Sequence, residues 1–188
     1  MERLTDEIAP FVYESRAKLP ASDEKLAEFL SADYRNARDE FTKQELLEKI
    51  KPVIKSTLTE AKSKGEYFLR VGTKLGQYDF DKKQFPSGFS SSTFIPFEIR
   101  FGMEVSRYAV MFDNIKEVEN IPLPLDAAKS LSGKLQQSRA ITAVVYCRIN
   151  GTQEKQMNYR DFKVMMAHVT KVDFLTDDGA LISTINTH

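Results

Sequence analysis

Histidine, the side chain best placed for proton transfer near neutral pH, is scarce in this chain. The sequence contains His168 and His188, the second as its last residue. His168 shares a predicted strand face with Phe162, Val164 and Met166. Because that face is apolar, we expect His168 to be a structural histidine, hydrogen-bonded within or beside the core, and we predict no catalytic residue.

Cysteine chemistry is limited to one residue, Cys147. A single cysteine excludes a disulfide within the chain and a zinc site of the usual multi-cysteine kind, and it fits a reducing cytosol. Cys147 lies on the apolar face of a predicted strand, where inert packing is the expected role. A Cys147–His168 pair between adjacent strands stays open as an alternative.

Two carboxylates, Asp79 and Asp81, flank Phe80. In an extended segment they point the same way, about 7 Å apart, which is a spacing that a hard cation can bridge. Lys82 and Lys83 follow at once and oppose a cation. The pattern therefore favours a solvated hairpin edge, and the sequence predicts neither a metal site nor a cofactor.

The segment from Phe85 to Phe94 places three aromatic residues around a small, hydroxyl-rich loop. Such a loop can clasp a ligand or a peptide, or it can connect two elements with its rings pinned to the core. It lacks the glycine–lysine pair of a phosphate-binding loop and the glycine-flanked serine of a nucleophile elbow. The candidate residues for ligand or partner binding are Asp79, Asp81, Phe85, Phe89, Phe94 and Asp113.

Several short stretches occur in a recognisable order: Tyr78-Asp-Phe80, Phe85-Pro86, Phe112-Asp-Asn114, Ala127-Ala128 and a strand opening at Arg139. With this order the chain resembles an uncharacterised bacterial domain family of unknown function that includes exported members, over about residues 67 to 185. The resemblance implies a bacterial source and an envelope address. It implies no activity and no catalytic residues.

The charges of the chain cancel, with 27 basic and 27 acidic residues, and they nearly cancel both in the part through Gly65 and in the part after it. Nucleic-acid binders and polybasic membrane anchors show a basic stripe or cluster, so we expect neither kind of partner. No run approaches the ~20 apolar residues of a membrane helix. The start, Met-Glu-Arg-Leu-Thr-Asp-Glu, has no signal-peptide pattern, which predicts a cytoplasmic protein, or a periplasmic or envelope-associated one if a leader has been removed.

The first third of the chain is predicted to be helical, because all eight glycines of the sequence lie at Gly65 or after it. Ser22 caps an expected helix over about 23–37. A capping-box pattern from Thr42 to Glu45 opens a second over about 42–64, which Pro52 kinks or restarts. Gly65 is the natural stop. The apolar stripe of this second helix must be covered by the sheet or by a partner: Leu47, Ile50, Ile54 and Leu58.

After Gly65 the apolar period becomes two, which predicts strands near 67–71, 94–101, 107–112, 139–149, 162–175 and 180–185. Pro96 indicates an edge strand or a bulge, and the pattern over 139–149 predicts a central strand. Asn150-Gly151 predicts a tight turn, with a longer polar excursion as the alternative.

Pro124 opens an inserted helix over about 124–135. The sum is an α+β fold with a mostly antiparallel, curled sheet, either a sandwich or a partial barrel. We expect one domain over 1–188, with a helical part (1–65) and a sheet part (66–188).

Three functions follow from this inventory. The first is a non-enzymatic binding or protein-interaction module, with an unidentified protein partner or small ligand. The second is a hydrolase that works through carboxylates, with Asp113 beside the Asp79–Asp81 pair as the first residues to test. The third is a small-ligand carrier with a cavity in the curled sheet, lined by residues such as Phe97, Phe101 and Met166.

Overall fold

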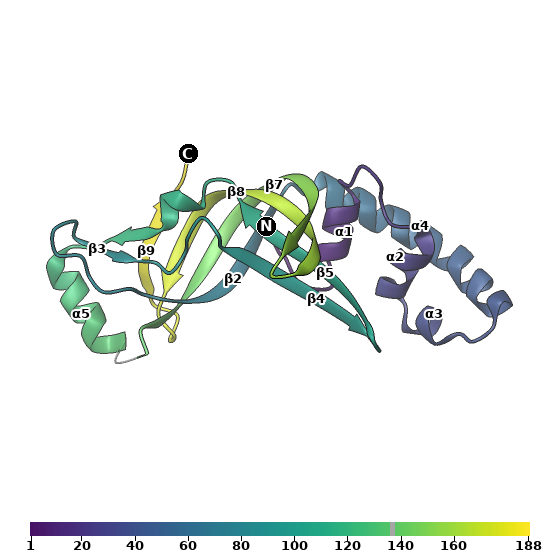
Figure 1. The fold of residues 1–188 in the computed structure, drawn as a ribbon, viewed down its shortest axis with the longest axis horizontal. Coiled ribbons are helices and arrows are strands. Elements are labelled where there is room, and N and C mark those ends of the chain that lie inside the picture. Colours follow the sequence, from purple (N-terminus) through teal and green to yellow (C-terminus); the bar gives the residue numbers. More distant parts are fainter. Residues whose placement is uncertain (136–137) are drawn as a thin grey trace.

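Most helices lie between the first two strands, β1 and β2, in the computed structural model, which describes residues 1–135 and 138–188 (Figure 1). The helices are α1 (Ala9–Glu14), α2 (Asp23–Leu30), α3 (Ala32–Asn36), α4 (Glu40–Ser63) and α5 (Leu125–Leu135), with a short 3-10 turn at Ile115–Val118. The strands are β1 (Glu2–Arg3), β2 (Glu66–Lys74), β3 (Gln84–Pro86), β4 (Phe94–Phe101), β5 (Glu104–Phe112), β6 (Asn120–Pro122), β7 (Ala140–Met157), β8 (Arg160–Leu175) and β9 (Leu181–Asn186). The predicted α+β class is confirmed.

The large sheet has the strand order β1-β2-β7-β8-β5-β4, and β9 pairs with the far end of β8. Its pairs are antiparallel except β1–β2 and β5–β8, which are parallel. The sheet curls into a half-barrel, so the partial barrel is the form adopted (Figure 1). The predicted places of two strands are confirmed, because β7 lies between β2 and β8 and the Pro96 strand, β4, lies at the edge.

The turn predicted at Asn150-Gly151 is wrong. β7 continues through these residues to Met157, with a register shift against β8 between Ile149 and Gly151. The chain reverses instead at Asn158-Tyr159, where both residues have positive φ, 50° and 60°, as a two-residue type I′ hairpin requires. The polar stretch after Gly151 is therefore the projecting end of a long β7–β8 hairpin.

The single helix expected over 23–37 is also wrong, because the chain forms two helices there. Ser31 adopts an extended conformation, with φ −133° and ψ 119°, and interrupts the helical hydrogen bonds. Its hydroxyl accepts the N–H of Tyr34 and caps α3. A serine that caps a new helix thus ends the preceding one.

Helix α4 begins earlier than the capping-box pattern indicated. Asp39 is its N-cap, and its carboxylate accepts the N–H of Thr42 at 2.8 Å. The helix runs through Pro52 and ends at Ser63, so the position of the stop before Gly65 is confirmed.

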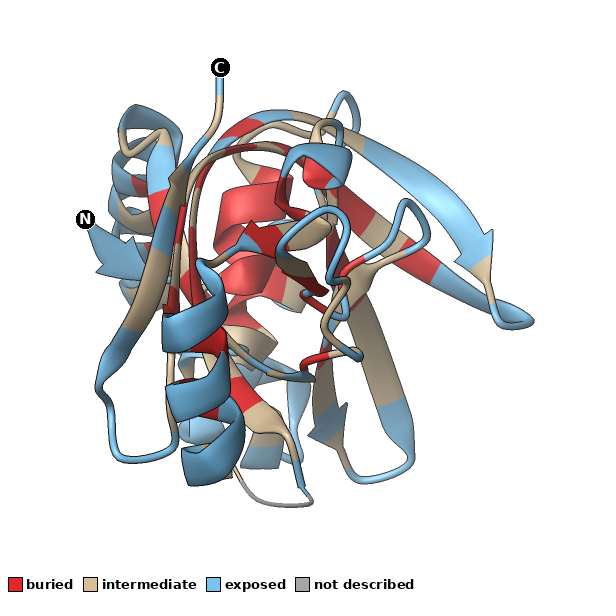
Figure 2. Ribbon diagram, turned by 90° about the vertical axis from the view of Figure 1, so that its left-hand side faces the viewer, coloured by how far each residue is buried: buried red, intermediate tan, exposed pale blue. Residues whose placement is uncertain are grey.

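The apolar stripe of α4 packs mainly on other helices, an arrangement that the sequence did not predict. α1, α2 and α3 all pack against α4. All six residues of α1 are buried, and this helix also contacts β5 and β8, so it joins the helical part to the sheet (red helix in Figure 2).

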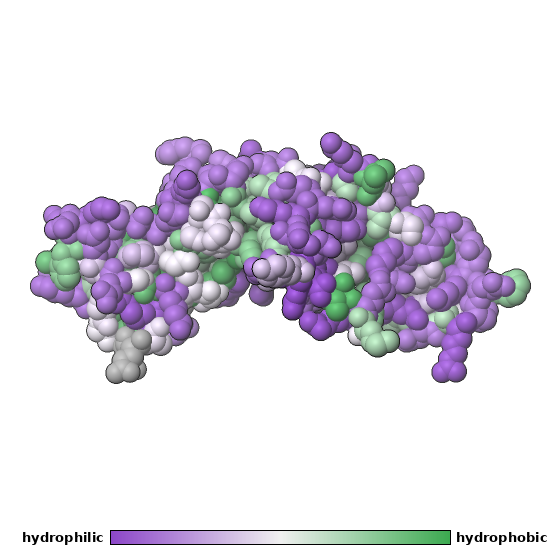
Figure 3. Space-filling view, viewed as in Figure 1, coloured by the Kyte–Doolittle hydropathy of each residue, from purple (hydrophilic) through white to green (hydrophobic). Residues whose placement is uncertain are grey.

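The apolar interior lies on both faces of the sheet. The main cluster joins the inner face to the helices, and it includes the predicted inner face of β7, from Ile141 to Ile149. A small second cluster of Ala109, Phe162 and Val164 lies on the opposite face, as the strand period of two requires. On the face drawn in Figure 3, apolar side chains show as small areas between hydrophilic ones, mainly over the sheet.

Candidate functional site

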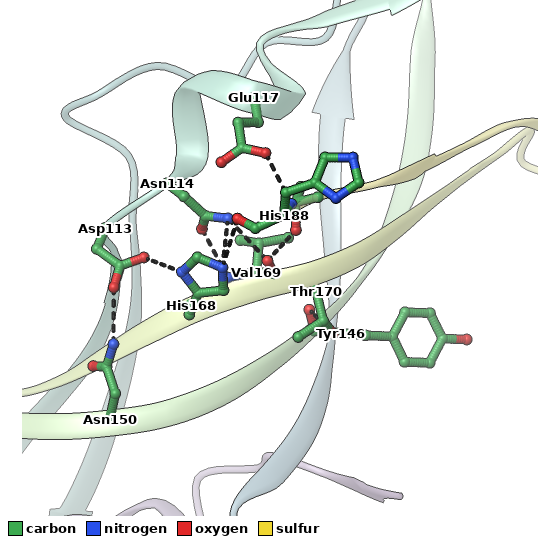
Figure 4. Close-up of polar contacts among 10 residues, drawn as sticks. Asp113, Asn114, Glu117, Tyr146, Asn150, His168, Val169, Thr170 and His188 are labelled. Atoms are coloured by element: carbon green, nitrogen blue, oxygen red, sulfur yellow. Dashed lines mark hydrogen bonds and ion pairs between the residues drawn. The ribbon is translucent and has the colours of Figure 1, made fainter.

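Asp113 and His168 form the first polar site (Figure 4). Asp113 follows the end of β5, and His168 lies on the neighbouring β8, with Nδ1 2.8 Å from the Asp113 Oδ1. A carboxylate on Nδ1 is the arrangement by which hydrolases orient an imidazole for proton transfer at Nε2. The sequence singled out both residues but did not predict that they meet.

The opposite nitrogen of His168 already contacts protein groups. Nε2 lies 3.3 Å from the side-chain nitrogen of Asn114 and 3.2 Å from the backbone oxygen of His188. The imidazole therefore links three segments of the chain to one another. This agrees with the structural histidine expected beside the core.

The side chain of Asn114 hydrogen-bonds to the backbone of β8 between the part that pairs with β5 and the part that pairs with β9. Its side-chain oxygen accepts the N–H of Val169 at 2.8 Å, and its side-chain nitrogen donates to the Val169 carbonyl at 2.9 Å. On the same edge of β8, the N–H of Asp113 donates to the Ala167 carbonyl before Asn114, and β9 pairs from Lys171 onward. We call residues 163–175 of β8, covered in turn by β5, Asn114 and β9, the closed edge.

Cys147 does not meet His168. In the β7–β8 ladder Cys147 lies opposite Val169, while His168 lies opposite Arg148, so the two side chains point to different faces. Cys147 is fully buried, and burial raises the pKa of its thiol to about 12. The thiolate is therefore scarce at neutral pH, as expected for inert packing.

The pair Asp79 and Asp81 lies in a turn before β3. The Asp79 carboxylate accepts the backbone N–H groups of Asp81 and Lys82, at 3.0 and 2.9 Å, and the Asp79 backbone bridges to Gln84. Asp113 does not join this turn, because its side chain bonds to His168 and to Asn150, at 2.8 Å each. Among the described residues, no group of three or more His, Cys, Asp or Glu is placed to hold a metal ion.

The three aromatic residues of the 85–94 segment point to different places. Phe85 is buried beneath Tyr78, and Phe89 is buried against Phe174. Phe94 packs on Phe162 in the small cluster of the opposite face. The rings thus anchor the segment at three separate points.

Gly88 fastens the same segment to β2. It has φ +83°, and a Cβ there would lie 2.2 Å from the hydroxyl of Thr73, which itself donates to the Ser87 carbonyl. Only glycine fits both the backbone angle and the close approach.

The residues named for a carrier cavity are also dispersed. Phe97 belongs to the main cluster, and Met166 packs against the small cluster on the other face of the sheet. Phe101 lies against Phe29 and beneath the guanidinium of Arg35, 4.3 Å from the ring centre. These three side chains do not line one cavity.

Comparison with known families identifies one that matches the chain. The profile described as Domain of unknown function (DUF4852) matches residues 22–132, more than half of the sequence. The chain belongs to this DUF4852 family. The resemblance to a domain family of unknown function is confirmed, although the match begins before residue 67 and ends before 185. No curated protein and no solved structure matches the chain.

A second polar site of this DUF4852 protein is a cleft of about 300 Å³ between α2, β5 and the β7–β8 hairpin. It is lined by Lys25, Val105, Ser106, Arg107, Tyr108, Glu154, Asp161, Phe162 and Lys163. The family segment supplies α2 and β5, and the hairpin lies outside it. The cleft therefore combines the matched segment with the rest of the chain.

The cleft opens where β5 and β8 diverge. Their parallel pairing runs from Tyr108–Lys163 to Phe112–Ala167 and does not extend to residues 105–107 or 160–162. Those residues pair only on their far sides, with β4 and β7. In Figure 2 the ends of the β4–β5 hairpin and the β7–β8 hairpin spread apart on the right-hand side. We call residues 160–162 of β8 and 105–107 of β5 the open edges.

A buried carboxylate anchors the floor of the cleft. Glu14 of α1 has a fully buried side chain that accepts from the ammonium of Lys163 at 2.5 Å and the backbone N–H of Ala21 at 2.8 Å. The hydroxyl of Tyr108 lies 3.3 Å away, and burial together with the Glu14 charge raises the pKa of Tyr108. This network fixes α1 on β5 and β8 at the point where the strands part.

The cationic side chains in the cleft wall are all paired with carboxylates. Lys25 contacts Glu28 and Glu104, Arg107 contacts Glu98, and Lys163 contacts Glu14.

The two acidic side chains of the wall have no such partner. Within the described parts of the chain, Glu154 forms no ion pair, and Asp161 contacts the neutral amide of Gln156. Beside Lys163, the uncompensated charge of the cleft wall is therefore negative, whereas Arg107 shares the single carboxylate of Glu98 with Arg100 and Arg160.

The sequence predictions missed these residues, although one signal was present. Lys163 lies on the same face of β8 as the buried residues Met165, Ala167 and Val169, and Glu14 ends the apolar run of α1. A single charge on an apolar face indicates a buried partner of opposite sign. Which two charges meet depends on the tertiary fold.

Proposed function

We propose that this DUF4852 protein is a non-enzymatic binding module whose partner or ligand occupies the cleft between α2, β5 and the β7–β8 hairpin. The observation that carries the proposal is the divergence of β5 and β8 before Tyr108–Lys163. Strand edges inside a sheet normally pair with each other, so two facing edges that part around a cavity offer hydrogen-bonding groups to another molecule.

The construction of the cleft supports this function. Its walls come from α2, from β5 and from a hairpin more than a hundred residues away from α2 in the chain. Lys163 holds the floor through an ion pair with the fully buried Glu14 carboxylate, which keeps the site pre-formed. Pre-formed walls lower the entropy cost of binding.

The carboxylate-dependent hydrolase stays a second candidate because Asp113 orients His168. Turnover would have to use the His168 Nε2, which Asn114 and the His188 carbonyl already contact. Asp113→Asn would abolish turnover by such an enzyme and leave cleft binding unchanged.

The binding proposal is tested by affinity capture with a cleft-filling variant. Wild-type protein, Ser106→Trp and Ser130→Trp are used as baits in extracts of the source cells. Ser106 lines the cleft, whereas Ser130 is exposed on α5 and serves as the matched control.

A partner retained by the wild type and by Ser130→Trp, but lost from Ser106→Trp, is the expected result. The same partners on all three baits would show that binding, if any, bypasses the cleft. The cytoplasmic location expected from the sequence is kept as part of the proposal, and fractionation of the source cells tests it. Among the described residues, no helix is both long and apolar enough to span a membrane.

A further inference from the structure

The cleft has the features of a site for one class of partner. We propose that it takes an extended peptide segment with Lys or Arg at alternate positions, which adds as a strand to the open edge of β5. This rests on the proposed binding function and specifies its partner.

The backbone of β5 sets the mode of binding. Residues 105–107 pair with β4 on one side and face the cleft on the other. The three residues of this edge extend over about 10 Å at roughly 3.3 Å per residue. A peptide of about six residues is long enough to pair along this edge by main-chain hydrogen bonds.

The charges of the cleft set the side chains of the peptide. The wall cations Lys25 and Lys163 are each neutralised by carboxylates of the protein, and Arg107 shares Glu98 with two other arginines. Glu154 and Asp161 keep an uncompensated negative charge beside the open edge. A basic side chain gains an ion pair here, whereas an acidic one meets repulsion.

The alternation follows from the faces of the strands. Glu154 lies opposite Lys163, and Asp161 precedes Lys163 by two, so both carboxylates share the face of Lys163 that α1 covers. Phe162 points to the opposite face, into the small apolar cluster, where Arg107 and Arg160 share the carboxylate of Glu98 and disfavour a further basic side chain. A strand in the cleft therefore presents basic side chains to one face and apolar side chains to the other.

The test uses a fluorescein-labelled peptide of three Lys-Val repeats, with a Glu-Val repeat peptide of equal length as its control. Fluorescence anisotropy at low salt measures the Kd for the full chain and for two double variants. Glu154→Gln with Asp161→Asn removes the cleft charges and keeps the shapes. Glu45→Gln with Asp126→Asn makes the same change in net charge at exposed positions on α4 and α5.

We expect the Lys-Val peptide to bind and the Glu-Val peptide not to bind. The cleft double variant should weaken the Kd by about three- to ten-fold, the size expected of two partly exposed ion pairs. The control double variant should bind as the wild type does, and Ser106→Trp should abolish binding.

Equal binding of the two peptides, no binding of the Lys-Val peptide, or equal losses in the two double variants would overturn the inference. Its failure is separable from failure of the binding function. If Ser106→Trp blocks capture of a cellular partner that the Lys-Val peptide does not displace, the cleft binds another class of partner. If Ser106→Trp leaves capture unchanged, the binding function itself fails. Self-association through the cleft that the peptide does not disrupt would also overturn the inference.

Discussion

Two stretches of the same edge of β8 are built in opposite ways. Along the closed edge, β5, the side chain of Asn114 and β9 supply backbone partners in succession. At residues 160–162, β5 has already turned away, and the edge meets a cleft with uncompensated carboxylates. The closed edge has the more familiar chemistry, an aspartate on a histidine, yet its polar atoms are occupied in joining segments of the fold.

The difference teaches where binding residues are to be sought. Polar side chains that satisfy one another and the backbone stabilise the sheet, whereas groups left without a partner at a cavity are free to recognise another molecule. We therefore propose a structural role for Asp113, Asn114 and His168, and a role in recognition for the cleft.

The largest expected effect comes from the floor of the cleft. Lys163→Met leaves the buried Glu14 carboxylate without its counter-charge and should lower the free energy of unfolding by about 3–5 kcal/mol. Glu14→Gln should cost less, because the side chain of Lys163 is 35% exposed and its ammonium can reach water. Urea denaturation measures the free energy of unfolding of both variants. Equal losses would contradict the claim that Glu14 is more deeply buried than Lys163.

Lys25→Met is the matched control for the lysine change. Its partners Glu28 and Glu104 are partly exposed, so its loss should cost less than about 1 kcal/mol. A Lys25 effect as large as that of Lys163 would contradict the special role of Glu14.

The next effect tests the closed edge. Asn114→Ala leaves the N–H of Val169 without a side-chain partner and the Val169 carbonyl with the Thr187 hydroxyl alone, and it should cost about 2 kcal/mol. Cys147 lies opposite Val169, so its labelling by a thiol reagent should also become faster in this variant. Asn150→Ala removes one exposed hydrogen bond to Asp113 and is the control. If Asn114→Ala had the labelling rate and the stability of the wild type, the side chain of Asn114 would not be what closes this edge.

The smallest effect is a pH dependence at the end of the closed edge, where Asp173 of β8 meets Thr184 of β9. Burial acts to raise the pKa of Asp173, but hydrogen bonds from Lys171 and Thr184 outweigh it and hold the pKa below the ordinary value. A lowered folded-state pKa gives stability above the ordinary Asp pKa that is lost as the pH falls through the lowered value.

Wild-type protein should therefore lose more stability than Asp173→Asn on acidification from about pH 5 to pH 3. Thermal unfolding across this range measures the difference. Parallel pH profiles would mean that Asp173 adds nothing to the pairing of β8 with β9.

Local patterns predicted the local structure well. The period of two located β4, β5 and the long strands, and Pro96 identified an edge, because side-chain alternation and a missing N–H act within a few residues. Ser31 and Asn158-Tyr159 escaped prediction. A serine can either continue or cap a helix, and the Asn150-Gly151 turn pattern was more typical than the turn that formed.

The polar sites depend on contacts between distant segments. Asp113 meets His168 across 55 residues, and Glu14 meets Lys163 across 149. The sequence supplied Asp113 and His168 as candidates but not their pairing. It supplied none of the cleft, because the divergence of two strands is a property of the curled sheet and not of either strand alone.

Residue-resolved amide hydrogen exchange of the full chain, with and without the Lys-Val peptide, tests the contrast between the two edges most directly. In the free protein, Val169 should be protected, and the amides of residues 105–107 and 160–162 that do not bond to β4 or β7 should exchange fast. The peptide should slow exchange on the open edge of β5 and leave Val169 unchanged. Protection of the cleft amides in the free protein, or peptide-induced protection around Asn114 and His168 in place of the cleft, would contradict the proposed contrast between the closed and the open edges.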